Sequence, residues 1–244
     1  FEARGDDYNR AALIHPLARD TERRILIESM AVEPDHRICD APAGGGYLAD
    51  GLRALVSDPA RIVCVEPSRT FARRLDAAYT IHIAPLEALP LTNGSIDRVG
   101  SLAGLHHLAD KAAFFREAFR VLKPGGRFAA ADVLHGTAVA RFLNGPVDRY
   151  TMTGHRGVFL QPGESSQLMK AAGFVDVSEA HRAYFWTFTS SAQMVHYCRS
   201  LFGMVRAGET EVHAALTAAF DIHLRQDEVL LPWSLVYAVG LKPA

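Results

Sequence analysis

Short apolar runs alternate with longer segments whose apolar residues recur at helical spacing, and this pattern continues along most of the chain. Runs that are apolar along nearly their whole length, such as RIVCV at 61–65, are typical of strands buried on both faces of a parallel sheet. The predicted strands are 38–39, 61–66, 81–84, 96–102, 127–133, 174–180 and 234–241. Strands that alternate with helices predict an α/β fold with a doubly wound, mostly parallel, seven-stranded sheet.

The predicted helices cover 17–30, 47–55, 68–78, 111–122, 137–149, 165–172 and 209–224. Residues 1–16 show no clear periodicity. In 17–30, apolar residues from Leu17 to Met30 oppose a charged face that includes Arg19 and Glu22, which predicts a helix packed on the sheet. Gly125 and Gly173 come shortly after two predicted helices, where a left-handed residue can close the turn.

Residues 181–233 interrupt what would otherwise be a hairpin of the last two strands. The segment is too apolar for a loose loop, so we expect a helical cap. Its apolar residues could form a core between the cap and the sheet, or could line a substrate pocket. They are Phe185, Trp186, Phe188, Met194, Tyr197, Leu201, Phe202 and Met204. The chain is therefore predicted to be one domain, with an N-terminal lid or packing segment (1–36), a cofactor-binding core (37–180), the cap (181–233) and a last strand (234–244).

Composition excludes several classes of protein. The chain has 244 residues, 49% of them hydrophobic, and a formal net charge of −1, so a large core is feasible and no basic block suggests nucleic-acid binding. The three cysteines are scattered without a C-x-x-C pair, and no apolar run is long enough to span a membrane. We expect a reduced, cytoplasmic protein. Since the chain begins with Phe1, we also expect the natural protein to start upstream.

A glycine-rich turn follows the first predicted strand. The strand ends at Asp40, and the turn leads into a helix that starts near Tyr47. Glycines let a ligand lie against bare backbone, and the helix N-terminus offers free N–H groups. A dinucleotide site would show G-x-G-x-x-G, but Ala49 occupies the last glycine position. The acidic residue ahead of the glycines favours another nucleoside ligand.

The segment DAPAGGG at 40–46 resembles motif I of the class I S-adenosylmethionine (AdoMet) methyltransferases, D-x-G-x-G-x-G, with Pro42 in place of the first glycine. Later segments extend the resemblance to small-molecule enzymes of the ubiquinone and menaquinone methyltransferase group. They are LP at 89–90, NGSID at 93–97, LHH at 105–107 and RVLKPGG at 120–126. The quinone enzymes carry G-L-R-N where this chain has GLHH at 104–107, so the resemblance over 37–133 does not extend to the substrate.

The resemblance implies a Rossmann-like fold whose last strand enters antiparallel, and it implies AdoMet as methyl donor with S-adenosylhomocysteine as product. Glu66 lies twenty residues beyond Gly46, where a carboxylate can accept both ribose hydroxyls. The family's adenine-binding acid is replaced by Pro85, which leaves adenine to the backbone at Leu86 and to Glu87. Tyr8 is a candidate lid residue. The predicted cofactor-binding residues are Tyr8, Asp40, Ala41, Pro42, Gly44, Gly46, Glu66, Pro67, Leu86, Glu87, Ser101 and Leu102.

Methyl transfer is an in-line displacement, and positioning alone can supply roughly 7–11 kcal/mol. Ligands of open α/β sheets bind beyond the carboxyl ends of the strands, so candidate catalytic groups follow the fourth and fifth strands. His106 is the first choice as base or substrate-orienting group, whereas His107 is expected to pack locally. Asp132 and His135 are further candidates. No metal is expected, because adjacent histidine side chains rarely point together and no carboxylate at 101–105 joins Asp132.

The predicted function is therefore AdoMet-dependent methyl transfer to an O, N or C atom of a small-molecule acceptor. An NAD(P)-dependent oxidoreductase is the alternative enzyme class, although neither its glycine fingerprint nor a tyrosine–lysine pair is evident. A non-catalytic AdoMet-binding module would share every binding motif, so the sequence leaves it open. The sequence also leaves the oligomeric state open, with a homodimer as one option. No nucleic-acid partner and no membrane span are expected.

Overall fold

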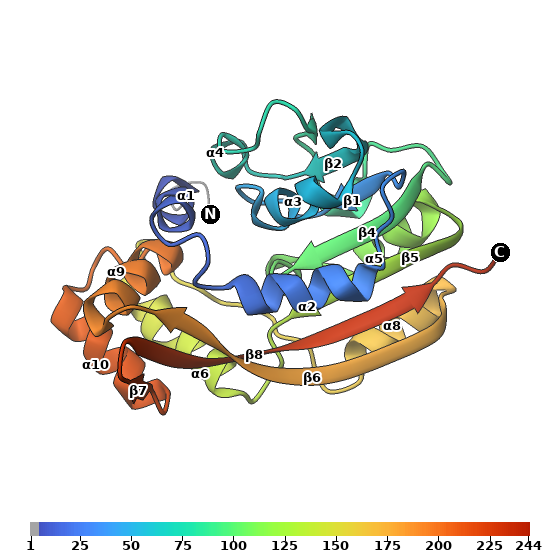
Figure 1. The fold of residues 1–244 in the computed structure, drawn as a ribbon. Coiled ribbons are helices and arrows are strands. Elements are labelled where there is room, and N and C mark those ends of the chain that lie inside the picture. The colour runs from blue at the N-terminus through green and yellow to red at the C-terminus, as the bar shows by residue number, and fades with distance from the viewer. Residues whose placement is uncertain (1–4) are drawn as a thin grey trace.

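The computed structural model describes residues 5–244 and consists of a twisted sheet covered by helices on both faces (Figure 1). Across these residues seven strands follow the order β3-β2-β1-β4-β5-β8-β6. An eighth, the short β7, pairs with β8, so the predicted count of seven strands is one too few. The strands are β1 Ile38–Asp40, β2 Ile62–Val65, β3 Thr80–His82, β4 Ile96–Leu102, β5 Leu122–Asp132, β6 Val175–Phe188, β7 His223–Arg225 and β8 Glu228–Leu241. The prediction of a Rossmann-like, mostly parallel α/β sheet is confirmed.

The parallel half of the sheet determines where polar groups can meet. β1 lies between β2 and β4, and Asp40 is paired in register with Cys64 on one side and Gly100 on the other. Since parallel strands end at the same edge, the residues that follow β1, β2, β4 and β5 share one edge of the sheet. β8 runs antiparallel to both β5 and β6, as predicted for the last strand.

Helices on the two faces bury two hydrophobic clusters. α2 and α3 pack on one face and α5 and α8 on the other (Figure 1). The helices are α1 Gly5–Ile14, α2 Asp20–Met30, α3 Tyr47–Leu52, α4 Arg69–Ala72, α5 Lys111–Val121, α6 Ala138–Phe142, α7 Asp148–Tyr150, α8 Glu164–Ala172, α9 Ser191–Phe202 and α10 Glu209–Ala219. Gly173 ends α8 in the left-handed conformation, as predicted. The same prediction is wrong for Gly125, because α5 ends at Val121 with an extended Leu122, and Gly125 has its positive φ inside β5.

The two C-terminal strands are longer than the sequence predicts. β6 and β8 each have 14 residues and carry the cap elements α9, α10 and β7 beyond the parallel strands (Figure 1). In β6, Tyr184, Trp186 and Phe188 are buried while Phe185 is 38% exposed. This alternation has the period of a strand, so the first aromatic residues of the predicted cap belong to the sheet.

The N-terminal segment also departs from its prediction. α1 is a helix despite its lack of clear periodicity, and it packs against α4 and α9. Leu17 lies before α2 and is 71% exposed, whereas Glu22, predicted on the charged face, is completely buried. The contacts that bury Glu22 come from β6, far away in the sequence.

Within the described residues, none of the helices has the length and apolar character needed to cross a membrane.

Candidate active site

A cavity of about 470 Å³ opens at the edge of the sheet where β1, β2 and β4 end. It is bounded by the glycine turn, by Tyr8 of α1 and by aromatic residues of the cap and the long hairpin. Most of the predicted site residues line it, namely Tyr8, Asp40, Pro42, Gly44, Glu66, Pro67, Leu86, Glu87, Leu102, His106 and His107. Ala41, Gly46 and Ser101 are not among the lining residues. Ala41 and Ser101 are fully buried, and Gly46 starts α3 with a φ of 90°.

The Asp40 carboxylate lines the cavity, and only one of its two oxygens has a hydrogen-bond partner among the described residues. Its Oδ2 accepts a hydrogen bond from the Ala49 N–H at 3.1 Å, while its Oδ1 is buried without a hydrogen-bond partner among the described residues. Burial raises the pKa of this carboxyl well above its usual range, the Ala49 N–H lowers it, and the charge of Glu66 raises it further. A cationic group placed at Oδ1 would reverse much of this effect.

Glu66 holds the glycine turn and also faces the cavity. Its two carboxylate oxygens accept hydrogen bonds from the Gly44 and Ser68 N–H groups, each at 2.8 Å. Glu66 also lines the cavity, so its carboxylate faces a bound ligand. The Ser68 side chain caps α4 by accepting from the Phe71 N–H. Asp40 and Glu66 therefore lie in one cavity, at the ends of adjacent parallel strands.

α1 covers the glycine turn. The Tyr8 ring lies 5.1 Å from the ring of Phe71, and its atoms come within 3.7 Å of the position that a Gly44 Cβ would take. Asn9 donates to the Phe71 carbonyl at 3.3 Å. A Cβ on Gly45 would approach the Asn9 Oδ1 to 2.2 Å. The absence of side chains in the turn thus lets α1 lie directly over it.

The region predicted to contact adenine lies at the same edge. Leu86 is 1% exposed and Glu87 is exposed, and both line the cavity together with Pro67 and Pro85. Pro42, the departure from motif I, packs against the loop that follows β4. A Cβ on Gly104 would come within 2.2 Å of the Pro42 ring, so glycine is needed there for this close approach.

His106, which also lines the cavity, forms a pair with Asp132. His106 Nδ1 lies 2.6 Å from Asp132 Oδ1, and Asp132 also accepts hydrogen bonds from the Leu105 and Val133 N–H groups, each at 2.6 Å. An ionised carboxylate only accepts hydrogen bonds, so Nδ1 of His106 carries a proton, and in the neutral imidazole Nε2 carries the lone pair. His135, the remaining candidate, is exposed and is not among the lining residues.

The cavity wall beyond this pair is aromatic and aliphatic. The rings of Trp186 and Trp233 stack at 4.0 Å, and Phe202 stacks on both at about 6 Å. The apolar residues of the insertion therefore fill both predicted roles, since some line the cavity and others form core. Trp186, Leu201 and Phe202 line the cavity, whereas Phe188, Met194, Tyr197 and Met204 are buried in the core without lining it.

A buried ion pair at the cavity was not predicted from the sequence. Arg19, which lines the cavity, pairs with Glu22 one turn later, and its guanidinium lies 4.9 Å from the centre of the Tyr47 ring. Glu22 also accepts hydrogen bonds from the Tyr184 hydroxyl at 3.1 Å and the Trp186 Nε1 at 2.9 Å. Because both partners of Glu22 on β6 lie about 160 residues away, no local pattern could identify this network.

Comparison with known proteins gives a consistent assignment for the core. Residues 39–130 match the family model described as a methyltransferase domain. The chain is 52% identical over 115 residues to a ubiquinone/menaquinone biosynthesis C-methyltransferase of Acidiphilium cryptum. The matched segment is 43% of this chain and 45% of that protein. It is 29% identical over 193 residues to a malonyl-[acyl-carrier protein] O-methyltransferase of Dechloromonas aromatica, covering 78% and 69%.

The matches cover the relatives unevenly. A 27-O-demethylrifamycin SV methyltransferase of Amycolatopsis mediterranei is 38% identical over 137 residues, which is 52% of this chain and 49% of that protein. The chain thus spans about half the length of most of these relatives. Among solved structures, a SAM-dependent methyltransferase from Thermotoga maritima has a TM-score of 0.67 at 19% identity, over 99% of this chain and 97% of that one. This similarity concerns the fold alone.

Proposed function

Because this chain belongs to the class I AdoMet-dependent methyltransferases, we propose that it transfers a methyl group from AdoMet to a small molecule with an apolar body. One observation carries the proposal. Asp40, whose Oδ1 is buried without a partner among the described residues, shares a cavity with Glu66, and the two end adjacent parallel strands. AdoMet offers what these groups need, namely an ammonium group and a ribose diol.

In this proposal, different residues of the cavity bind different parts of AdoMet. Asp40 accepts from the ammonium group of the methionine portion, and Glu66 accepts from both ribose hydroxyls. The adenine lies between Leu86 and Pro67, within reach of Glu87, and Tyr8 covers the nucleoside from above. All six side chains line the cavity. Ala41, Gly46 and Ser101, which do not line it, would act through the shape of the turn and of the strand end.

When bound, AdoMet supplies a methyl group on a positively charged sulfur that needs no further activation. The protein's contribution is then to align the acceptor with the carbon–sulfur bond and to exclude water. α1 closes the cavity over the glycine turn, and the wall of Trp186, Trp233 and Phe202 encloses the acceptor. His106 presents its Nε2 lone pair to the acceptor. It accepts the acceptor's hydrogen bond, and then its proton, as the new bond to carbon forms.

The composition of the wall favours a class of acceptor. The rings of Trp186 and Trp233 offer flat apolar surface, which suits an aromatic or polyene body. The histidine–aspartate pair suits an acceptor whose reacting atom bears a proton, an O–H or an N–H, because the imidazole can take up that proton as the new bond forms. His107 is exposed beside His106 and would contact the polar end of the acceptor.

Two measurements on the full chain test the proposal. Isothermal titration with AdoMet should show saturable binding at one site, and labelled AdoMet with a small-molecule extract should yield a labelled, extractable product. Folded protein that gives no heat of binding would overturn the proposal. Binding without any product across chemically varied extracts would instead identify the non-catalytic AdoMet-binding module.

A further inference from the structure

Three histidines from two separate segments meet at the acceptor end of the cavity. His106 and His107 follow β4, and His155 lies in the loop after α7. One ring nitrogen from each lies within 4.8 Å of those of the other two. The ring centres of His106 and His107 are 4.1 Å apart, so the expectation that these neighbours point away from each other is wrong. All three side chains line the cavity.

The hydrogen bonds of two of these histidines determine which nitrogen carries a lone pair. Asp132 holds Nδ1–H of His106, as described above. Asn144 does the same for His155, since its Oδ1 lies 3.2 Å from His155 Nδ1. The orientation of the Asn144 amide follows from Gly157, whose N–H donates to Oδ1 at 2.8 Å and whose carbonyl accepts from Nδ2 at 2.9 Å. Both His106 and His155 therefore carry the lone pair on Nε2.

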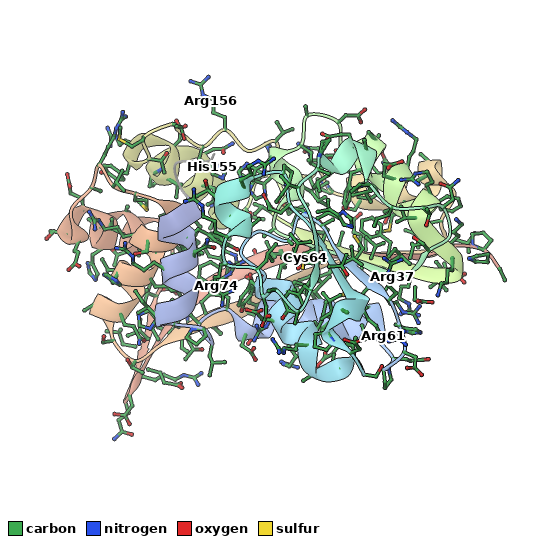
Figure 2. The ribbon with its side chains drawn as sticks, turned by 90° about the horizontal axis from the view of Figure 1, so that it is seen from above. Arg37, Arg61, Cys64, Arg74, His155 and Arg156 are labelled. Atoms are coloured by element: carbon green, nitrogen blue, oxygen red, sulfur yellow. The ribbon has the colours of Figure 1, made fainter. Side chains whose placement is uncertain are left out.

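The two segments are tied together by the backbone. The Val158 N–H donates to the His106 carbonyl at 3.0 Å, and the His155 N–H donates to Asp148 Oδ1 at 2.7 Å. His155 is 4% exposed and points into the molecule, whereas its neighbour Arg156 extends into solvent (Figure 2). The cluster is thus built by contacts that orient its rings and does not depend on surface side chains alone.

We propose that His106, His107 and His155 bind a divalent transition-metal ion of the Zn²⁺ type, with an open coordination position that faces the acceptor. Neutral imidazoles are the ligands that Zn²⁺, Co²⁺ and Ni²⁺ accept readily, and Zn²⁺ sites with three protein ligands leave a fourth position open. Outer-sphere oxygens that hold Nδ1–H of a ligating histidine, here from Asp132 and Asn144, are typical of such sites.

The geometry requires a modest contraction on binding. Zn–N bonds of about 2.0–2.1 Å in a tetrahedral site place ligand nitrogens about 3.4 Å apart. The three nitrogens lie within 4.8 Å of one another, so each pair must approach by at most about 1.4 Å. His107 is exposed and can supply much of this movement. The open position would take a water or an oxygen of the acceptor.

This inference rests on the proposed function in one respect only, which is that the bound ion would contact the methyl acceptor. Binding of the ion depends on the three histidines alone. A metal ion and a proton compete for the same Nε2 lone pair of His106. The hydrogen-bonding role proposed above therefore belongs to the metal-free protein, and in the loaded protein the acceptor oxygen is held by coordination.

The experiment uses tag-free full-length chain that has been stripped with a chelator. Calorimetric titration with Zn²⁺ should show one equivalent bound, and Co²⁺ should produce visible absorption bands of a low-coordinate site. Replacement of one histidine should weaken binding by more than the about 10- to 100-fold loss seen when only an outer-sphere partner is removed. The variants are His107→Ala and His155→Ala, with His213→Ala on the exposed surface of α10 as the matched control.

The control variant should bind Zn²⁺ as tightly as the wild type. No saturable binding to the wild type, or equal affinity in His107→Ala and the wild type, would overturn the inference. His155 is buried and its variant could fail to fold, so the exposed His107 carries the decision. AdoMet titration of the same samples separates the two proposals, since AdoMet binding without Zn²⁺ binding would refute the metal site alone.

Discussion

Replacement of Asp40 by asparagine tests whether this residue binds the ammonium group of AdoMet, and it does not change the shape of the site. The side chain is 1% exposed, and only its Oδ2 accepts a hydrogen bond from the described part of the chain, that of the Ala49 N–H. Asparagine can keep that bond through its carbonyl oxygen. At the position of Oδ1 it would present an amide N–H₂, which repels an ammonium group. Asp40→Asn should therefore impair AdoMet binding and leave the fold intact.

The size of the effect follows from the charged hydrogen bond that the variant removes. A hydrogen bond to a charged group contributes about 1.5–3 kcal/mol, so the Kd for AdoMet should rise about 10- to 150-fold. The effect should lie toward the upper part of this range, because the site is buried and screening by solvent is weak. Calorimetric titration measures it directly, with Asp227→Asn in the exposed β7–β8 turn as the control for a change of charge.

The same variant should affect the ligand-free protein in the opposite direction. Burial raises the folded-state pKa of Asp40 above its unfolded value. The neutral form is thus favoured in the folded chain, and its contribution to stability is fully present below pH of about 4 and is lost as the pH rises through the folded-state pKa. Ligand-free Asp40→Asn should melt at a higher temperature than the wild type at pH 7–8, by about 2–4 °C per kcal/mol. The difference should shrink toward pH 4.

Two results would refute this reasoning. Unchanged AdoMet affinity in a folded Asp40→Asn protein would show that Asp40 does not hold the ammonium group. A ligand-free variant that melts below the wild type at pH 8 would show that the buried carboxylate is stabilised by a partner that the geometry does not reveal. The Asp227→Asn control should match the wild type in both assays.

Three further predictions follow from the site. Glu66→Gln should raise the Kd for AdoMet about tenfold or more, because it loses charged hydrogen bonds to the ribose and to the Gly44 N–H; unchanged calorimetric affinity would contradict the ribose assignment. Glu22→Ala should lower the free energy of unfolding by about 3–5 kcal/mol in urea titrations, because it leaves Arg19 buried and unpaired; a loss below about 1 kcal/mol would show that the pair is not needed. Trp233→Leu should raise the KM for the acceptor and leave the Kd for AdoMet unchanged, and a reversed pattern would place the ring beside the nucleoside.

Much of the sheet could be predicted because its strands are buried on both faces. The apolar runs around Cys39 and Cys64 and the glycine turn after Asp40 each carry a local signal, and the structure places them in β1, β2 and the turn between β1 and α3. The parallel topology then brings Asp40 and Glu66 to one edge without any further information. This part of the site could therefore be predicted before any contact was known.

The remainder depends on contacts between distant segments. α1 is stabilised by packing on α4 and α9 and by the hydrogen bond from Asn9 to Phe71, so its own periodicity is weak. Glu22 resembles a surface residue until β6 supplies Tyr184 and Trp186. His155 lies 49 positions beyond His106, and the backbone hydrogen bond from Val158 to His106 holds their two loops together. The length of β6, in contrast, has a local signal, because its aromatic residues alternate between buried and exposed positions at 184–188.

A crystal structure of the full chain with S-adenosylhomocysteine tests the central assignment most directly. We predict that the amino group of the homocysteine portion lies within hydrogen-bond distance of Asp40 Oδ1 and that both ribose hydroxyls donate to Glu66. The sulfur should point toward His106. A nucleoside bound elsewhere, or bound in this cavity with its ribose away from Glu66 and its amino group away from Asp40, would contradict the assignment.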